Sequence, residues 1–285
     1  MGPARLWPTP RLLLVVVAVA SAACATARNY LDPLGPSYQG HHAAPGGWSS
    51  DPTPSDAPLR VVTFNIEHGR KIDRALEVLR GSEPLRNADV LALQEMDAAG
   101  VETIARELGL NYVYVPSGVH PKSGRDFGCA LLSPWPLEQP RKVRLPHAAR
   151  MTRLRRVAVG TTLRRGGQRV RVYSLHLPSP PAISGGARRE QIRTVLADAE
   201  ASPDPVILAG DFNSHGIGNE VVRAGYSWPT RDVGTTSKWL GIGFSFDHVF
   251  GKGLASAPGL SAGVVKDNRG ASDHRPVWAV LVAAR

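Results

Sequence analysis

The chain has 285 residues, carries a formal net charge of +10 and is 42% hydrophobic. These values are sufficient for one large globular domain or two small ones. They exclude a fold built on a disulfide framework, because the only two cysteines are Cys24 and Cys129, and processing at Cys24 leaves the other without a partner. Cys129 stands in an apolar run, so we expect it to be a small buried core residue rather than a nucleophile.

The first residues have the layout of a secretory signal peptide. Arg5 and Arg11 precede an apolar run at residues 12–20, and small residues follow it. The run is short for a membrane span, although an uncleaved anchor is the alternative. Cys24 directly follows the small residues, as in the lipobox of bacterial lipoproteins, so acylation there and ordinary cleavage nearby both stay open. We expect residues 1–23 to be a signal segment and the protein to be exported, either secreted or as a cell-envelope lipoprotein.

Residues 24–58 are predicted to be a flexible linker, because they are rich in Pro, Gly, Ser and His and show no periodic apolar pattern. The pair His41-His42 in this segment is expected to be solvated rather than to bind a metal. From residue 59 to residue 285, apolar runs alternate with stretches of helical periodicity. We expect a single domain here, since the groups that suit one site come from both of its ends.

Short apolar runs predict buried strands, and apolar residues three and four apart predict helices. The predicted strands lie at residues 60–66, 89–94, 130–132, 206–209, 246–250 and 277–282. The predicted helices lie at residues 71–80, 101–108 and 192–199. Residues 157–163 and 169–175 are expected to form a hairpin around Gly166-Gly167. This alternation favours an α/β or α+β domain with hairpins over a purely parallel sheet.

Several of the apolar runs end in groups that bind a cation or move a proton. These groups are Asn65, Glu95, Asp211 with Asn213, and Asp273 with His274. They are costly to bury alone, so strands that all finish in them indicate one shared site. Oxygen ligands of this kind suit Mg²⁺ or Mn²⁺ rather than zinc. The sequence therefore predicts metal-assisted hydrolysis of a phosphate ester.

The spacing of two pairs of residues predicts where their side chains point. If the strand continues past Asp211, then Asp211 and Asn213 share one side of it and Phe212 turns into the core; an Asx-turn after the strand is the alternative. His248 directly follows Asp247, so a regular strand would direct it to the opposite face, where we expect a structural role.

Six motifs occur in the order found in the endonuclease/exonuclease/phosphatase superfamily. They are Thr63-Phe64-Asn65, Gln94-Glu95, Ser174-Leu175-His176-Leu177, Gly210-Asp211-Phe212-Asn213, Phe246-Asp247-His248 and Ser272-Asp273-His274. Each motif is weak alone, but six in order are a specific signal. The chain thus resembles this superfamily from about residue 59 to residue 281. The resemblance implies an α+β fold of the DNase I type, in which two packed mixed β-sheets are flanked by helices in a four-layer αββα sandwich.

The resemblance also implies roles for individual residues. It assigns catalysis to His176, Asp211, Asn213, Asp247 and His274. The cation, Mg²⁺ or Mn²⁺, is assigned to Asn65, Glu95 and Asp273. Asn65 could instead orient Glu95, and Asp273 could instead support the ligands from behind. Asp247 would orient the imidazole of His274, as carboxylates commonly do. Mechanisms within the family differ on the general base, which therefore stays open here. Arg125, in a glycine-containing loop that also holds Lys122, is our candidate for a clamp on the substrate phosphate, and a solvated loop charge is the alternative.

The positive charge of the chain is concentrated in residues 141–171, which hold eleven Arg and Lys residues and no Asp or Glu. Such a field favours polyanions, namely DNA, RNA or an anionic membrane surface. A solvated sheet edge that discourages strand pairing is the alternative. The aromatic residues Trp228, Trp239 and Phe244 could stack on bases, insert into lipid or pack in the core.

Together these patterns predict an exported, divalent-metal-dependent phosphodiesterase, with a DNase I-like nuclease as the leading hypothesis. A phospholipid or small-molecule phosphodiesterase that resembles sphingomyelinase is the second hypothesis. A non-catalytic, polyanion-binding lipoprotein is the third, and the complete set of site residues argues against it. We expect a monomer with nucleic acid as its substrate.

Overall fold

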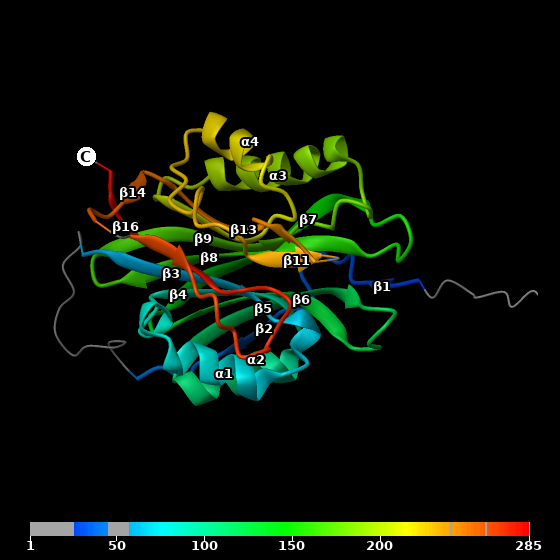
Figure 1. The fold of residues 1–285 in the computed structure, drawn as a ribbon, viewed down its shortest axis with the longest axis horizontal. Helices are drawn as coiled ribbons and strands as arrows, with labels where there is room; N and C mark the ends of the chain where they lie inside the picture. Colours follow the sequence, from blue (N-terminus) through cyan, green and yellow to red (C-terminus); the bar gives the residue numbers. More distant parts are fainter. Residues whose placement is uncertain (1–25, 45–56, 240, 260, 285) are drawn as a thin grey trace, which may run out of the picture.

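Two β-sheets pack face to face, and helices cover the outer face of each, so the computed structural model has four layers (Figure 1). The structure describes residues 26–44, 57–239, 241–259 and 261–284. The predicted four-layer αββα sandwich of the DNase I type is confirmed by this arrangement. Within the described ranges, no helix is long and apolar enough to cross a membrane.

The larger sheet contains nine strands that come from both ends of the chain. They are β1 (Arg28–Asn29), β2 (Tyr38–Gly40), β3 (Leu59–Asn65), β4 (Val90–Met96), β5 (Asn111–Val119), β6 (Asp126–Ser133), β14 (Leu254–Ser256), β15 (Ala262–Val264) and β16 (Val277–Ala283). The central pair, β3 and β4, is parallel, and β16 lies antiparallel to β3. The last strand of the chain is therefore a direct neighbour of the first long one.

The smaller sheet is continuous in sequence apart from its last strand. Its order is β13-β10-β9-β8-β7. The strands are β7 (Leu137–Ala148), β8 (Arg155–Arg165), β9 (Gln168–His176), β10 (Val206–Asp211) and β13 (Asp247–Lys252). β9 and β10 are parallel, whereas the other pairs are antiparallel. A separate two-stranded hairpin consists of β11 (Ser237–Trp239) and β12 (Ile242–Phe244).

The helices form the two outer layers. α1 (Ile72–Gly81) and α2 (Ala98–Leu108) cover the larger sheet, and α3 (Gly185–Glu200) and α4 (Gly218–Arg223) cover the smaller one (Figure 1). Two short 3₁₀ turns, η1 (Glu67–Gly69) and η2 (Glu83–Leu85), flank α1. The Asp97 side chain accepts a hydrogen bond from the Gly100 N–H at the start of α2, and Ser184 does the same for α3, so two of the helix starts have side-chain caps.

Three apolar clusters hold the four layers together. The cluster between the sheets includes Val61, Val159 and Ile207. The cluster under α1 and α2 includes Phe64, Leu76 and Ile104. The cluster under α3 and α4 includes Leu175, Ile192 and Val221. Because each sheet buries both faces, its central strands are apolar on both sides, which is the pattern that made them recognisable in the sequence.

Most predicted elements are present with ends shifted by one to three residues. The hairpin of β8 and β9, α1 and α2 lie where the sequence placed them, whereas α3 begins seven residues before the predicted segment and β6 begins four residues before. The sequence analysis missed β5 and β7, the two longest strands without a prediction. β7 carries charged side chains in its middle and lies at the edge of its sheet, so it lacks the apolar run of a central strand.

The prediction of a flexible linker is wrong for part of residues 24–58. Within that range, β1 and β2 both pair with β5 and extend the larger sheet. Residues 26–40 form an ordered segment that we call the N-terminal strap. It has little apolar periodicity because backbone pairing and polar contacts, rather than burial, fix it to the domain. The predicted signal segment at residues 1–23 lies outside the described residues.

Candidate active site

The predicted site residues meet where the parallel strands of the two sheets end. In the larger sheet, Asn65 of β3 lies opposite Gln94 of β4. In the smaller sheet, Asp211 of β10 lies opposite His176 of β9. Gln94 Nε2 donates a hydrogen bond to Ser174 Oγ at 3.1 Å, which ties the two sheets together directly beneath this point. The carboxyl ends of four strands thus face one another.

A β-bulge directs Glu95 into the site. The pairing of β4 with β6 skips one residue between Gln94 and Met96, and Glu95 there has a positive φ of 58°. A non-glycine residue with this backbone conformation is strained, and such strain concentrates at functional positions. The carboxylate accepts a hydrogen bond from the backbone N–H of His68, whose own φ is 60°. The strained backbone at Glu95 and His68 therefore directs this carboxylate into the site at a cost in conformational energy.

Asn65 links the carboxylates of the two sheets. Its amide nitrogen donates to Glu95 Oε1 at 3.3 Å and to Asp211 Oδ2 at 3.0 Å. Its amide oxygen accepts from the backbone N–H of Glu67 at 3.1 Å, which fixes the orientation of the amide. In this arrangement Asn65 orients the two carboxylates, and its predicted role as a metal ligand stays a prediction.

Asp211 and Asn213 converge by an Asx-turn, which was the alternative to a continued strand. The backbone N–H of Asn213 donates to Asp211 Oδ1 at 2.8 Å, and the φ of Asn213 is 48°. The Asn213 amide nitrogen lies 3.2 Å from His176 Nε2, which in turn lies 3.3 Å from Asp211 Oδ2. Gly210 permits this close packing, since a Cβ there would lie 2.0 Å from the Leu175 carbonyl oxygen.

His274 and Asp247 form the buried pair that the family resemblance implied. The distance from His274 Nδ1 to Asp247 Oδ2 is 2.8 Å, and His274 Nε2 lies 3.7 Å from Asp211 Oδ2. Ser272 holds the loop in place, because its hydroxyl donates to the Asn65 carbonyl and accepts from the His274 N–H. Burial alone would lower the pKa of His274, but the two neighbouring carboxylates outweigh burial and raise that pKa well above its usual value.

The other two titratable groups at the centre have pKa values shifted by burial. Burial raises the pKa of Asp211 to about 7, and the nearby Asp247 carboxylate adds to this shift. Burial lowers the pKa of His176 well below its usual value, and the positive charge of Arg156 lowers it further. Near neutral pH, the centre therefore holds a neutral His176, a charged His274 and an Asp211 that can gain or lose a proton.

These groups line a cleft with a volume of ≈ 410 Å³. Asp273 also lines it, but its side chain is exposed, unlike those of its neighbours Ser272 and His274. The opposite wall of the cleft is partly apolar and consists of Pro180, Pro181, Phe244 and Phe246. The rings of Phe244 and Phe246 stack with a centroid separation of 4.9 Å. The cleft is thus acidic at its base and apolar along one side.

The guanidinium that faces the cleft is that of Arg156, not that of Arg125. Arg156 lines the cleft, lies 3.2 Å from His176 Nδ1 and stacks over the ring of Phe127. Arg125 instead pairs with Asp97 at 3.0 Å and donates to the His68 carbonyl. The structure therefore does not bring Arg125 into the cluster. Sequence reasoning missed Arg156 because it is one of eleven cations between residues 141 and 171, and nothing in the pattern distinguishes it.

His68 and His120 were also missed. Their rings lie 4.5 Å apart and pack against Phe127 beside Glu95, and His68 Nε2 is 3.5 Å from Glu95 Oε2. The only sequence signal is the position of His68 just after the Asn65 motif. His248, by contrast, lies where it was expected, on the far side of its strand, buried against Phe212 and Trp228.

The donor groups suit a hard divalent cation. One oxygen or nitrogen each from Asp211, Asp247 and His274 lie within 4.8 Å of one another, and Asp247 Oδ1 has no hydrogen-bond partner among the described residues. Glu95 adds a carboxylate at the base of the same cleft. Buried carboxylates that outnumber their cationic partners are a favourable place for a metal ion.

Solved structures show the same fold at low sequence identity. An endonuclease/exonuclease/phosphatase from Beutenbergia cavernae has a TM-score of 0.62 and 23% identity, with 80% of this chain and 72% of that chain covered. D. rerio TDP2 complexed with single strand DNA product has a TM-score of 0.61 and 17% identity, with 79% and 99% covered. The human Nocturnin catalytic domain has a TM-score of 0.57 and 17% identity, with 80% and 96% covered.

No curated protein matches this chain by sequence. The sequence model of the Endonuclease/Exonuclease/phosphatase family does match, over residues 62–274. The matched segment begins in the strand that carries Asn65 and ends at His274, so it contains all the strand ends that form the cleft. The chain belongs to the Endonuclease/Exonuclease/phosphatase family and is a phosphoesterase of that family.

Proposed function

We propose that this chain is an exported phosphodiesterase that requires Mg²⁺ or Mn²⁺ and cleaves nucleic acid. The observation that carries the proposal is the continuous network at the base of the cleft. Glu95, Asn65, Asp211 and His274 follow one another at 3.3, 3.0 and 3.7 Å, although they come from remote parts of the chain. A site made only for stability would satisfy its charges with cations, and this one leaves carboxylates in excess.

The cation would be held by Glu95 and Asp273, with Asn65 beside them. When bound, it would neutralise charge on the phosphate and so favour attack on the phosphorus. The donor set supports this assignment, since it consists of carboxylates and an amide at the base of one cleft.

The protein's own groups suit general acid–base catalysis. Asp211, with its pKa raised to about 7 by burial, takes a proton from the attacking water. The water oxygen forms the new bond to phosphorus, and the bond from phosphorus to the leaving oxygen breaks. His274, kept protonated by Asp247, gives its Nε2 proton to that leaving oxygen. Neutral His176 and the fixed charge of Arg156 orient the phosphate.

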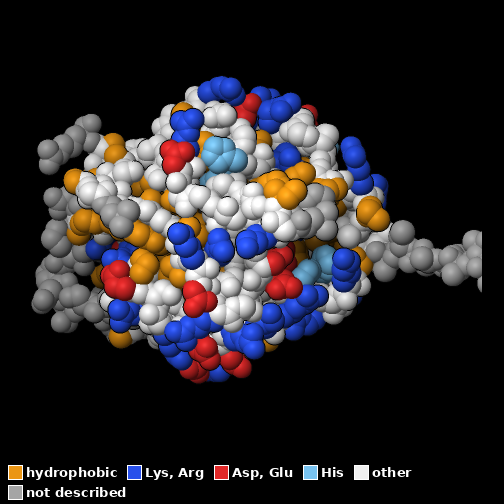
Figure 2. Space-filling model, viewed as in Figure 1, with side chains coloured by type: hydrophobic (Ala, Val, Ile, Leu, Met, Phe, Trp, Pro, Cys, Tyr) orange, Lys and Arg blue, Asp and Glu red, His pale blue; other side chains and the backbone are white. Residues whose placement is uncertain are grey.

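Two findings support nucleic acid as the substrate. The D. rerio TDP2 structure was solved with a single-stranded DNA product, and its fold matches this chain over most of its length. In addition, this chain carries the basic segment of residues 141–171, from which Arg156 enters the cleft. Figure 2 shows Lys and Arg side chains in several groups across one face of the molecule, with Asp and Glu between them. Such a surface attracts a polyanion at low salt.

A lipid phosphodiester is the second candidate substrate, and the apolar wall of the cleft favours it. Phe244 and Phe246 stack there beside two prolines, and Ile242, in the same hairpin, exposes 61% of its surface. An acyl or sphingoid chain could lie along this wall, but a nucleobase could also stack on it.

A substrate panel tests the proposal. Plasmid DNA, single-stranded DNA, RNA, phospholipids and inositol phosphates are each incubated with the protein, with and without Mg²⁺. We expect cleavage of nucleic acid that EDTA abolishes. Cleavage of phospholipid alone would select the second candidate, and binding of DNA without hydrolysis of any substrate would indicate a non-catalytic protein. Persistent activity in EDTA would refute the metal requirement.

A further inference from the structure

The N-terminal strap closes the edge of the sandwich and touches both sheets. β1 and β2 pair with β5 of the larger sheet. On the other side, the Ala27 N–H donates to the Thr152 carbonyl and the Asn29 amide donates to the Arg153 carbonyl, both in the turn before β8. The Asn29 amide oxygen accepts from the Arg155 N–H, in β8 of the smaller sheet. Hydrogen bonds therefore fix the strap to both sheets, and the strap is a rigid part of the surface.

A lysine holds the middle of the strap in one shape. Lys142 Nζ donates to the carbonyls of Tyr30, Asp32 and Gly35 at 2.8, 2.9 and 2.7 Å. Arg144 donates to the Leu31 carbonyl at 2.9 Å. Three carbonyls around one ammonium leave this loop little freedom, so the side chains that it displays are held in place before any partner arrives.

The side chains displayed by this rigid loop are apolar. Leu34 exposes 91% of its surface and Leu31 exposes 51%. Six large apolar side chains are exposed among the described residues, and three of them, Leu31, Leu34 and Tyr38, belong to the strap. A fourth, Met151 at 77%, adjoins the Thr152 carbonyl that the strap contacts. Exposed leucines on an ordered loop indicate a binding surface, because nothing in the fold requires them there.

The charged groups around the apolar loop are mostly basic. Exposed arginines at residues 28, 144, 153 and 155 flank it. The acidic side chains nearby have internal partners: Asp32 accepts from the Leu34 N–H, and Asp126 accepts from the Tyr30 hydroxyl. An apolar centre with a basic rim matches the interface of an anionic bilayer, where leucines enter the acyl boundary and arginines meet the head groups.

The chain upstream of the strap leads to an apolar run. Residues 12–20 are apolar, and only six residues separate residue 20 from Ala27, where the strap first contacts the domain, which makes seven residue steps. Seven extended residues span at most about 25 Å. Wherever that run enters a membrane, the strap must therefore lie close to the membrane surface.

We propose that the N-terminal strap is a docking surface for an anionic lipid bilayer. The strap also fixes where the cleft lies relative to that surface. Arg28 pairs with Val119, and the next residue, His120, packs on His68, which hydrogen-bonds Glu95. Docking by the strap thus holds the cleft end of the sandwich near the membrane. This inference concerns binding to lipid and does not depend on which phosphodiester the cleft hydrolyses.

Vesicle partition of the full chain tests the proposal. All variants carry Cys24→Ser, so that none can be acylated, and all keep the same residues 1–23. Vesicles are made of phosphatidylcholine, with or without phosphatidylglycerol. We expect Leu34→Ser to weaken partition roughly 10-fold on both vesicles, and Arg155→Glu to weaken it roughly 5-fold on the anionic vesicles alone. The matched controls are Val222→Ser on α4 and Arg86→Glu near η2, both exposed and remote from the strap.

Equal partition of the strap variants and the controls would overturn the proposal, whatever the activity of the protein. If Leu34→Ser and Arg155→Glu kept their partition but lost affinity for an oligonucleotide, the strap would be a nucleic-acid surface instead. Far-ultraviolet circular dichroism confirms that each variant is folded. Failure of the proposed hydrolysis shows in the substrate panel alone, so the two proposals can fail separately.

Discussion

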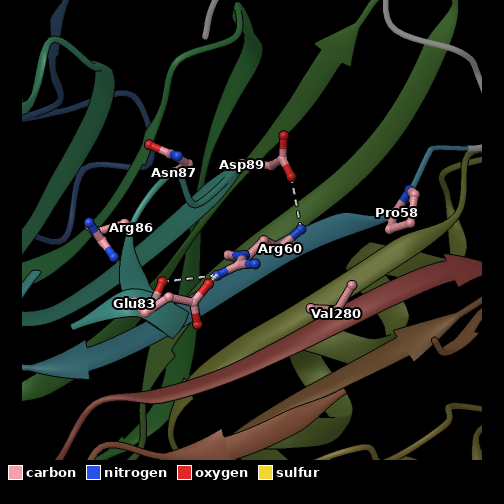
Figure 3. A pocket seen from close by; sticks show the side chains of 7 residues that line it. All are labelled: Pro58, Arg60, Glu83, Arg86, Asn87, Asp89 and Val280. Atoms are coloured by element: carbon pink, nitrogen blue, oxygen red, sulfur yellow. Dashed lines mark hydrogen bonds and ion pairs between the residues drawn. The ribbon is translucent and has the colours of Figure 1, made fainter. Parts of the chain in front are cut away.

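The carboxyl ends of β3 and β4 border the cleft, and the amino ends of the same two strands border a second polar pocket, with a volume of ≈ 460 Å³ (Figure 3). The second pocket contains Arg60, Glu83, Arg86, Asn87 and Asp89. The two places therefore offer similar side chains on the same pair of strands. They differ in how the charges are matched.

In the second pocket every buried charge has a partner. Asp89 accepts from the Arg60 backbone N–H at 2.8 Å and from Trp135 Nε1 at 2.9 Å, and Arg165 Nε lies 3.3 Å away. Arg60 in turn contacts Glu83 through its guanidinium (Figure 3). The backbone of this pocket contains one positive-φ residue with a side chain, Asn87, a type that tolerates it well.

At the cleft, the carboxylates of Glu95, Asp211 and Asp247 contact amides, imidazoles and a threonine hydroxyl. The backbone at Glu95, His68 and Asn213 is held in the left-handed region. Asp247 keeps an unpartnered oxygen. Polar side chains alone therefore do not distinguish the cleft from the second pocket. The cleft differs in that it combines carboxylates of unmatched charge with a strained backbone, two features that selection for stability alone would not retain.

The largest expected effect is on turnover when a carboxylate is neutralised. Glu95→Gln should lower kcat/KM about 10³-fold, because the base of the cleft loses the charge proposed to hold the cation. Glu83→Gln is the matched change in the second pocket and should leave turnover within about 2-fold of the unchanged protein. Steady-state kinetics on the best substrate of the panel measure both. Similar losses of kcat/KM in the two variants would show that unmatched charge does not distinguish the cleft from the second pocket.

The next largest effect concerns the imidazole. His274→Ala should lower turnover by at least about 10²-fold while leaving the fold intact, since the leaving oxygen would lose its proton donor. His248→Phe replaces another buried histidine, which lies on the face of β13 away from Asp247 and His274, and should retain activity. An unchanged rate in His274→Ala would remove His274 from the mechanism.

A third experiment compares two arginines. Arg156→Met should lower turnover about 30-fold, because its guanidinium is the one that lines the cleft. Arg125→Met should lower turnover much less, because Arg125 bridges Asp97 and the His68 carbonyl outside the cleft. The reverse order would restore Arg125 as the substrate clamp that the sequence suggested.

These arginines show how far the sequence could lead. Asn65, Glu95 and Asp211 were predictable because each ends an apolar strand, and parallel strands bring such ends together. His274 was predictable only from its motif, since it precedes β16 rather than ending a strand. Arg156 was not, since its role depends on the turn of one side chain toward His176. β7 and the strap were missed for a related reason. Sheet edges are fixed by backbone pairing and by contacts such as those of Lys142, which leave no periodic pattern.

Replacing an aspartate by asparagine should have opposite effects on the free energy of unfolding in the second pocket and in the cleft. Asp89→Asn leaves the nearly buried Arg165 without a carboxylate and should lower the free energy of unfolding by about 2 kcal/mol. Asp211→Asn should raise the free energy of unfolding by about 1 kcal/mol at pH 8. The pKa of Asp211 is raised to about 7 in the folded chain, so ionisation of this carboxyl destabilises the fold as the pH rises from the pKa of the unfolded chain through 7. Asparagine does not ionise, so the variant lacks this destabilisation. Urea denaturation of both variants gives the two signs, and equal signs would contradict the difference in charge matching.

The smallest effect tests whether the scaffold behind the cleft is also sensitive to charge. Burial lowers the pKa of His248 to about 3, with the nearby His215 adding to the shift. The unfolded chain takes up a proton at this position below about pH 6.5 and the folded chain does not, so stability falls with pH through that range. From pH 7.5 to pH 5.5, His248 should lower the free energy of unfolding by about 1 kcal/mol.

His248→Phe, which fits among Phe212, Trp228 and Phe250, should remove this share of the loss of stability in acid. Parallel urea titrations at the two pH values measure it. An unchanged pH dependence in the variant would mean that His248 is charged in the fold, and that unmatched charge is not confined to the cleft.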